Sequence, residues 1–360
     1  MPALLLITAA CATLLLALAL PLLAALRLLA TRLPPRARAL ARLLLLLAAY
    51  IATFECPAIL AATRLRARGR LTTPALGHPC RTPAEQHLER LTGRFFQRGF
   101  QLAGLGIHRD APPPDPAPQR PVLVIARHAG FLNAQLLTHE VFRTLGRRTM
   151  AITKLSVKAA PGFGALVPGT FITPYRWTTH GRACALRRMI TMARYATPED
   201  GLVLFPEGTN ITATRRRAAI DRLHAEEHPA RADRYHRLHH VLPPQATGVR
   251  VVLRAMPGAD VLFFAHTGLE DLLAPLVDLG YPPLADGILH TTWWHVPAEQ
   301  IPREQAAFEA WLDDWWQTLD EWTAIIRTRP AAPAPRPPAR PVPQQRDPEA
   351  PVDRGKAAPP

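Results

Sequence analysis

An apolar run breaks into a turn at Val203-Leu204-Phe205-Pro206-Glu207-Gly208-Thr209-Asn210. Gly201–Phe205 has the length and composition of a buried strand, and the proline and glycine that follow predict that the strand ends there. Gly208 permits a close approach of the backbone, because glycine has no Cβ atom. The stretch therefore predicts a strand that leads into a tight, polar turn.

The residues after this turn predict a helix whose start can bind an anion. Thr209 and Asn210 are residue types that cap helices, and the pattern favours a helix over about Thr214–Glu227. The backbone N–H groups of a first helical turn can bind phosphate. Arg215 lies in that turn and two more arginines follow it, although a solvated arginine run would look the same.

A second apolar run, Pro121–Ala126, leads into Arg127-His128-Ala129-Gly130. A histidine at the C-terminal end of a strand projects into the crevice where open α/β sheets bind ligands. The ordinary pKa of histidine suits it to take a proton from a hydroxyl near neutral pH. A lone histidine at a strand end is more often structural, so His128 gains weight only beside other motifs.

Apolar strands and helical stretches alternate through this part of the chain. Further strands are predicted at Met150–Thr153 and Asp260–Ala265, and further helices at about Asn133–Leu145 and Gly181–Tyr195. Such alternation indicates an α/β fold with helices layered around a central sheet.

A closing helix is predicted at Arg303–Arg327, where large apolar residues recur at steps of three and four. The stripe consists of Phe308, Trp311, Leu312, Trp315, Leu319 and Trp322. Core packing is the favoured interpretation of the stripe, and membrane contact is the alternative.

Residues 3–26 carry no charge, and a helix of that length spans a bilayer core of roughly 30 Å. A second apolar stretch, Leu43–Thr63, contains Glu55 and Pro57. A carboxylate at bilayer depth is costly, so we expect this stretch to dip into the membrane or to break at Pro57. Arginines bracket it on both sides, which favours a hairpin with both flanks facing cytoplasm and anionic lipid. One or two true spans are the alternative.

The predicted boundaries follow these changes in composition. Thr82 and Glu85 form a capping box for an amphipathic helix that either lies on the membrane or faces the core. The expected division is a membrane anchor of two apolar helical segments (1–70), an amphipathic helix with a proline-rich linker (71–120), a catalytic domain (121–329) and a disordered proline-rich tail (330–360).

The net charge of +15 comes almost wholly from arginine, which suits anionic lipid headgroups or phosphorylated substrates. Nucleic acid is disfavoured, because no nucleic-acid-binding motif appears and the arginines flank apolar segments. The four cysteines show no metal-ligand spacing, so we expect reduced, structural cysteines and no bound metal.

These motifs together resemble the glycerolipid acyltransferase family, which includes 1-acylglycerol-3-phosphate acyltransferases. The family has a histidine followed five residues later by an aspartate, then an arginine motif, then Phe-Pro-Glu-Gly. His128, Gly169-Thr170-Phe171-Ile172 with Arg176, and Phe205-Pro206-Glu207-Gly208 match in this order, and Val241-Leu242-Pro243-Pro244 is similar to a fourth motif. The region from about Pro83 to Arg327 looks like an actinobacterial-type branch, on the stretches Arg127–Gly130 and His266–Glu270.

The resemblance implies a glycerol-3-phosphate acyltransferase-like fold with a central mixed sheet. It also implies an O-acyltransferase on the cytoplasmic face of a bacterial cell membrane. His128 would be the general base, Arg176 and Arg215 would hold phosphate, and Glu207, Gly208 and Thr209 would position the acceptor or the motif turn. The implied partners are an anionic bilayer, a lysophospholipid acceptor (lysophosphatidic acid by default) and acyl-CoA or acyl carrier protein as acyl donor, with no bound cofactor.

One position departs from the family pattern: Asn133 stands where the family has aspartate. Its amide oxygen can accept a hydrogen bond from the histidine ring, or its nitrogen can donate one and favour the wrong tautomer. In serine proteases the same change at the orienting aspartate lowers turnover about 10⁴-fold. A second carboxylate such as Glu140 is one possible compensation, and a catalytically impaired lipid-binding or scaffold protein is the alternative function.

Overall fold

The computed structural model describes residues 25, 32–71, 82–112, 114–116, 119–130, 132–154, 161–166, 171–173, 179–284 and 287–329. These residues form one seven-stranded sheet with the strand order β1-β7-β6-β2-β5-β3-β4. The strands are β1 (Gly106–Arg109), β2 (Val122–Ala126), β3 (Arg148–Lys154), β4 (Phe171–Thr173), β5 (Asp200–Leu204), β6 (Asp260–Thr267) and β7 (Ile288–Val296).

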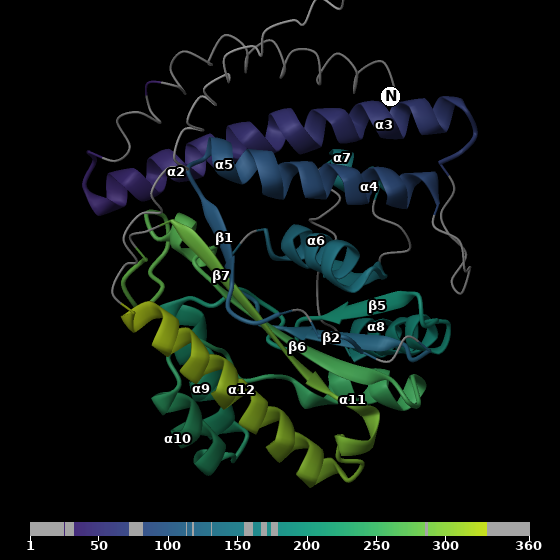
Figure 1. The fold of residues 1–360 in the computed structure, drawn as a ribbon. Helices are drawn as coiled ribbons and strands as arrows, with labels where there is room; N and C mark the ends of the chain where they lie inside the picture. Colours follow the sequence, from purple (N-terminus) through teal and green to yellow (C-terminus); the bar gives the residue numbers. More distant parts are fainter. Residues whose placement is uncertain are drawn as a thin grey trace, which may run out of the picture. The chain divides into compact units, whose positions relative to one another are not determined.

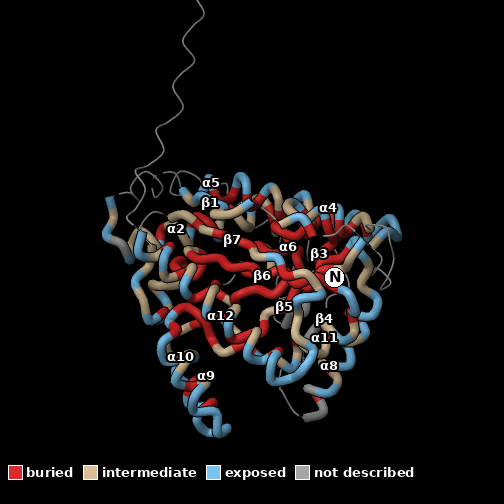
Figure 2. Tube along the Cα trace, turned by 60° about the horizontal axis from the view of Figure 1, so that its bottom comes forward, coloured by how far each residue is buried: buried red, intermediate tan, exposed pale blue. Residues whose placement is uncertain are grey.

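The sheet is mixed. Strands β2 to β6 run parallel to one another, β7 runs antiparallel to β6, and the edge strand β1 runs parallel to β7. Every residue of β2, β5 and β6 is buried, as expected for central strands covered on both faces. Figure 2 shows these strands as a buried band between helices whose outer sides are exposed.

One face of the sheet is covered by the helices from the first part of the chain (Figure 1). They are α2 (Pro35–Tyr50), η1 (Ile51–Glu55), α3 (Cys56–Ala67), α4 (Pro83–Arg94), η2 (Phe95–Gly99), α5 (Phe100–Leu102), α6 (Asn133–Leu145) and α7 (Pro161–Leu166). They pack on Val122, Val124, Leu262 and Phe264, which are alternate residues of β2 and β6.

The other face carries helices from later in the chain (Figure 1). They are α8 (Thr179–Arg194), α9 (Ala213–Ala225), α10 (Pro229–Arg237), α11 (Ala246–Ala255) and α12 (Gln305–Thr328), with short 3₁₀ turns η4 (Glu270–Leu273) and η5 (Ala298–Gln300). Phe308, Leu312, Trp316 and Leu319 of α12 are buried in this second core. The core interpretation of the aromatic stripe is therefore confirmed.

The prediction of an α/β fold with a central mixed sheet is confirmed, and the predicted strands and helices occur with ends shifted by a few residues at most. The pattern missed β1, β4 and β7, and it missed α10 and α11. The capping box is present, because Thr82 Oγ1 accepts from the backbone N–H of Glu85 and Glu85 Oε2 accepts from that of Thr82, at 3.2 and 2.6 Å. The helix that it starts buries Leu88 and Leu91 in the core.

Of the two expectations for Leu43–Thr63, a dip into the membrane or a break at Pro57, the break is wrong. Arg36–Ala67 forms one continuous helix, because the five residues Ile51–Glu55 adopt π-helical hydrogen bonding just before the proline. Such a bulge absorbs the backbone hydrogen bond that proline cannot donate. Glu55 has hydrogen-bond partners within the protein, because it accepts from the Tyr50 hydroxyl at 3.2 Å and from the Gly162 backbone N–H at 2.6 Å.

Arg36–Ala67 is long and apolar enough to cross a membrane, and no other helix in the described ranges meets that criterion. Its inner face packs on the domain through Phe54, Ala58 and Ala62, while Leu44 and Leu47 are exposed. The other predicted anchor segment, residues 3–26, lies outside the described residues apart from Ala25.

Candidate functional site

His128 lies where β2 ends, between the neighbouring strands β5 and β6. Its ring packs 4.7 Å from the ring of Phe205, measured between centroids, and the residue is half-buried. The backbone N–H of His128 donates to Glu207 Oε2 at 2.9 Å. The structure therefore brings His128 and the Phe-Pro-Glu-Gly turn together at the C-terminal edge of the parallel strands, where open α/β sheets bind ligands.

Glu207 is buried and its carboxylate accepts hydrogen bonds from three separate segments of the chain. Only 5% of the residue is exposed. Its other carboxylate oxygen, Oε1, accepts hydrogen bonds from the Leu242 backbone N–H at 3.1 Å and from Trp316 Nε1 at 3.0 Å. Burial raises the pKa of Glu207 to about 7, against the opposing effects of Arg127 and of the three N–H donors. Of the two roles considered for Glu207, this geometry favours positioning of the motif turn.

Asn133 faces the histidine ring with its amide nitrogen. Asn133 Nδ2 lies 2.8 Å from His128 Nδ1, 2.5 Å from the Gly130 carbonyl oxygen and 2.9 Å from Asn210 Oδ1. The Gly130 carbonyl can only accept, so it fixes the amide orientation. Asn133 Oδ1 is buried and has no hydrogen-bond partner within the described part of the chain. A neutral ring that accepts from this nitrogen carries its own proton on Nε2.

The loop after His128 is held by a close contact with the loop after β6. Gly130 has a φ of +101°, and a Cβ atom there would lie 2.9 Å from Leu269 Cγ and 3.2 Å from the Glu270 backbone nitrogen. Only glycine fits such a position without strain. The two stretches that carried the resemblance to the actinobacterial-type branch, Arg127–Gly130 and His266–Glu270, are therefore in contact.

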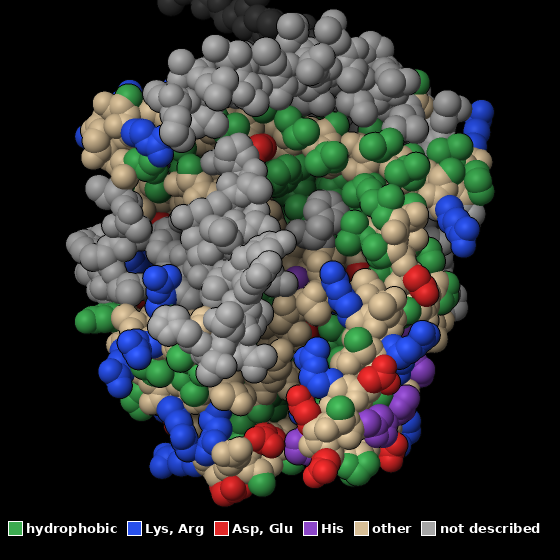
Figure 3. Space-filling view, turned by 180° about the vertical axis from the view of Figure 1, so that it is seen from behind, with side chains coloured by type: hydrophobic (Ala, Val, Ile, Leu, Met, Phe, Trp, Pro, Cys, Tyr) green, Lys and Arg blue, Asp and Glu red, His purple; other side chains and the backbone are tan. Residues whose placement is uncertain are grey.

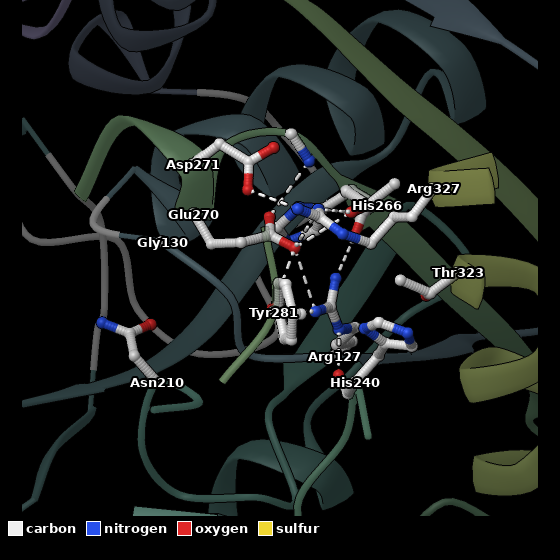
Figure 4. Close-up of polar contacts among 12 residues, drawn as sticks. Arg127, Gly130, Asn210, His240, His266, Glu270, Asp271, Tyr281, Thr323 and Arg327 are labelled. Atoms are coloured by element: carbon white, nitrogen blue, oxygen red, sulfur yellow. Dashed lines mark hydrogen bonds and ion pairs between the residues drawn. The ribbon is translucent and has the colours of Figure 1, made fainter. Parts of the chain in front are cut away.

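A buried ionic network surrounds Arg127, the residue before His128 in the chain (Figure 4). Arg127 is fully buried, donates to the His240 carbonyl oxygen at 2.7 Å, and pairs with Glu270 at 3.0 Å. Arg327, from the end of α12, contacts Glu270 at 3.5 Å and Asp271 at 2.7 Å. Burial tends to raise the pKa of Glu270, but the two guanidinium groups outweigh it and hold that pKa well below its usual range.

Two histidines beside this network are held neutral. Burial lowers the pKa of His266 to about 3 and, with the charges of Arg127 and Arg327, lowers that of His240 to about 3. Neither ring nitrogen of His266 has a hydrogen-bond partner among the residues that the structure describes. These two histidines therefore pack beside the ionic network as neutral side chains, whereas His128, the histidine of the motif, is half-buried.

The helix after the Phe-Pro-Glu-Gly turn starts later than the predicted caps. Thr212 caps α9, because its Oγ1 accepts from the Arg215 backbone N–H at 3.2 Å, so the prediction that Thr209 and Asn210 cap this helix is wrong. Asn210 instead joins the two motifs. Its backbone carbonyl accepts from Arg215 Nη1 at 3.0 Å while its side chain contacts Asn133.

The remaining predicted site residues are placed unequally. Gly208 is exposed on the turn with a φ of +69°, and Thr209 beside it is half-buried. Arg176 lies outside the described residues. Glu140 is wrong as the compensating carboxylate, because both of its oxygens are taken by Arg109, at 2.7 and 3.4 Å, with Thr144 also donating.

A cleft of about 250 Å³ opens beside the loop that supports Gly130. Gly268, Asp271 and Leu272 line one side, and Arg38 and Arg42 of α2 line another. The cleft therefore lies between α2 and the loop after β6 that contacts Gly130.

Among the described residues, one group of potential metal ligands comes together, and it lies at the edge of the sheet. His108, Asp110 and His290 place one ligand atom each within 4.8 Å of one another. The sequence did not point to this group, because His290 on β7 lies far along the chain from His108 on β1 and from Asp110, which follows β1.

Comparison with known proteins bears on the fold. The crystal structure of the 1-acyl-sn-glycerophosphate (LPA) acyltransferase PlsC from Thermotoga maritima matches with a TM-score of 0.52 and 15% identity, covering 83% of this chain and 100% of that one. The chain has the PlsC fold. No family model matches the sequence, and no curated protein matches it. The PlsC-like fold agrees with the predicted glycerol-3-phosphate acyltransferase-like architecture.

Sequence reasoning missed two parts of this candidate site. Trp316, which binds Glu207, lies outside the stripe that the pattern singled out, although it is the fully buried tryptophan of α12. Asn210 was assigned as a helix cap, whereas its side chain contacts Asn133. Helical periodicity alone cannot say which side of a wide apolar face meets a carboxylate.

Proposed function

We propose that this protein is a membrane-associated O-acyltransferase. It transfers a fatty acyl group from acyl-CoA or acyl carrier protein to the hydroxyl of a lysophospholipid-type acceptor, with lysophosphatidic acid as the default. The observation that supports this most is the hydrogen bond from the His128 backbone to Glu207 in a PlsC-like fold. This hydrogen bond lies at the C-terminal edge of the parallel strands, where open α/β sheets bind ligands.

In the proposed reaction His128 Nε2 accepts the proton of the acceptor hydroxyl while the oxygen attacks the thioester carbonyl. The tetrahedral intermediate then collapses, the C–S bond breaks, and the leaving thiolate takes the proton from the imidazolium. The products are the acylated lipid and a free thiol. Base action at Nε2 requires the ring proton on Nδ1. The proposal therefore requires the Asn133 amide to turn over during this step, so that it gives up its hydrogen bond to the Gly130 carbonyl and presents its oxygen to the ring.

In this proposal, arginine side chains bind the phosphate of the acceptor. Arg215 projects from the first turn of α9 and is exposed, although its side chain also donates to the Asn210 carbonyl. Arg176 is proposed on the motif resemblance alone. Arg38 and Arg42 line the nearby cleft and add positive charge at the side where α2 meets the domain.

The proposed membrane contact is a helix that lies along the interface. Arg36–Ala67 is anchored to the domain by Phe54 and Ala58, so it cannot cross a bilayer and keep this packing. Arginines occupy both of its ends and the exposed Leu40, Leu44 and Leu47 lie between them. Figure 3 shows that the described hydrophobic side chains gather over this helical layer, whereas charged ones gather over the opposite one.

A second candidate is a catalytically impaired lipid-binding protein with this fold. The orientation of Asn133 favours it, because a donor at His128 Nδ1 stabilises the tautomer whose Nε2 is already protonated.

Purified protein on anionic vesicles, supplied with radiolabelled acyl-CoA or acyl carrier protein, tests the proposal across a panel of lysophospholipids. The proposal requires labelled diacyl product from at least one acceptor. Vesicle binding without transfer for every donor and acceptor would support the second candidate instead.

A further inference from the structure

The edge of the sheet carries a group of side chains with the geometry of a metal site. Strands β1 and β7 pair in parallel with His108 opposite His290, and their ring centroids lie 5.3 Å apart. Asp110 follows His108 by two residues, so both side chains project from the same face. His290 Nδ1 lies 3.3 Å from Asp110 Oδ2, and His108 Nε2 lies 3.8 Å from Asp110 Oδ1.

These separations fit a small divalent cation. With bonds of about 2.0–2.1 Å to nitrogen and oxygen, tetrahedral Zn²⁺ ligands lie roughly 3.3–3.4 Å apart. The two imidazole–carboxylate distances are close to that value, and the remaining separation, within 4.8 Å, shortens when the His108 side chain, which is 59% exposed, rotates toward the other two ligands. Two imidazoles and one carboxylate leave a fourth position for water.

We propose that His108, Asp110 and His290 bind a divalent transition-metal ion of the zinc class. Asp110 and His290 are largely buried, with 11% and 14% of their side chains exposed, so two of the three ligands are held in place by the fold. Imidazole ligands disfavour Mg²⁺ and Ca²⁺, which prefer all-oxygen sites.

Arg329 competes for this site. Its Nη1 lies 3.0 Å from Asp110 Oδ1, so the guanidinium balances the carboxylate. Bound Zn²⁺ takes over that carboxylate and releases Arg329, which follows the last turn of α12. The competition predicts that removal of the arginine charge tightens metal binding.

The proposed site links the edge strand β1 to β7, which lies far along the chain. Strand β1 is an edge strand of four mostly exposed residues, and metal binding would tie it to β7 through His290. A ligand that binds only the folded state raises the unfolding temperature.

The test is a titration of the full-length purified protein with Zn²⁺ against a chromophoric chelator, with Co²⁺ absorption as a probe of coordination. We expect one Zn²⁺ per chain, a visible Co²⁺ band, and a rise in unfolding temperature. His290→Ala and His108→Ala should each weaken Zn²⁺ binding at least tenfold, and Arg329→Gln should strengthen it severalfold.

His295→Ala is the matched control. His295 lies on the same strand and contacts Asp260 at 3.0 Å, but it belongs to no three-ligand group among the described residues. Its Zn²⁺ affinity should equal that of the wild type, and circular dichroism should show all variants folded. Wild-type binding no tighter than that of folded His290→Ala, or equal loss in His295→Ala, would overturn the proposal.

Discussion

The amide nitrogen of Asn133 lies 2.8 Å from Nδ1 of His128, at the position where the acyltransferase motif that the sequence resembles has an aspartate. A donor at this place favours the ring proton on Nε2, while a carboxylate favours it on Nδ1 and leaves Nε2 as the base. In the proposed reaction, the residue five positions after the histidine therefore sets the fraction of molecules in which His128 Nε2 is unprotonated and can act as the base.

Asn133→Asp should raise kcat by about tenfold or more, because it removes this donor and supplies a charge that stabilises the imidazolium. The carboxylate also sits at the start of α6, where the helix dipole favours negative charge. Steady-state kinetics against pH would measure the gain, with Gln97→Glu, at an exposed position outside the site, as the control for an added charge. An unchanged or lower kcat in a folded variant would mean that the Asn133 oxygen already faces the ring in the working enzyme.

Glu207→Gln should lower kcat with little change in KM, because glutamine presents an amide donor to one of the three N–H groups that the carboxylate now accepts. Displacement of the His128 loop by about 1 Å can cost roughly 10²-fold in rate. A large rise in KM alone would instead assign Glu207 to acceptor binding. Glu226→Gln, at an exposed position after α9, is the control.

His266→Phe should stabilise the protein, and more so in acid. His266 has a pKa lowered from 6.5 to about 3 by burial, so below pH 6.5 the unfolded chain binds a proton that the folded chain does not. Stability is thus lost as pH falls from about 6.5 to 3, at about 1.4 kcal/mol per unit. Urea unfolding of both proteins at pH 7 and pH 4.5 measures this. If the difference in free energy of unfolding between the two proteins is no larger at pH 4.5 than at pH 7, the burial argument is contradicted.

Leu40→Ser, Leu44→Ser and Leu47→Ser combined should weaken binding to anionic vesicles without loss of stability, because these side chains are exposed on one face of α2. Each loses up to roughly 2 kcal/mol of interfacial burial if it enters the bilayer. Vesicle sedimentation would measure the loss, and Leu276→Ser, exposed elsewhere, is the control. Equal vesicle binding by the triple variant and the wild type would remove α2 as the contact.

The parts of this fold that sequence could predict are those that local patterns define. Buried runs such as Pro121–Ala126 and the helix Asn133–Leu145 depend on periodicity over a few residues, and they appear nearly as predicted. Strand β7 was missed although Ile288–Val296 is rich in aromatic and β-branched residues, because histidines interrupt its apolar pattern.

The site was predictable only in part, for a similar reason. His128 and Glu207 lie in short motifs, but their hydrogen bond joins residues 79 positions apart. The other two partners of Glu207, Leu242 and Trp316, lie 35 and 109 positions away from it. The amide orientation at Asn133 depends on the carbonyl of Gly130, and a sequence contains no information on which atom of an amide faces inward.

The most direct test of the account compares His128→Ala with the wild type in single-turnover transfer of labelled acyl groups to lysophosphatidic acid on vesicles. His87→Ala, a histidine substitution on α4, controls for histidine loss. The account predicts that the His128 variant binds vesicles and folds normally but transfers at least about 10³-fold more slowly. Transfer by folded His128→Ala at the wild-type rate would contradict it.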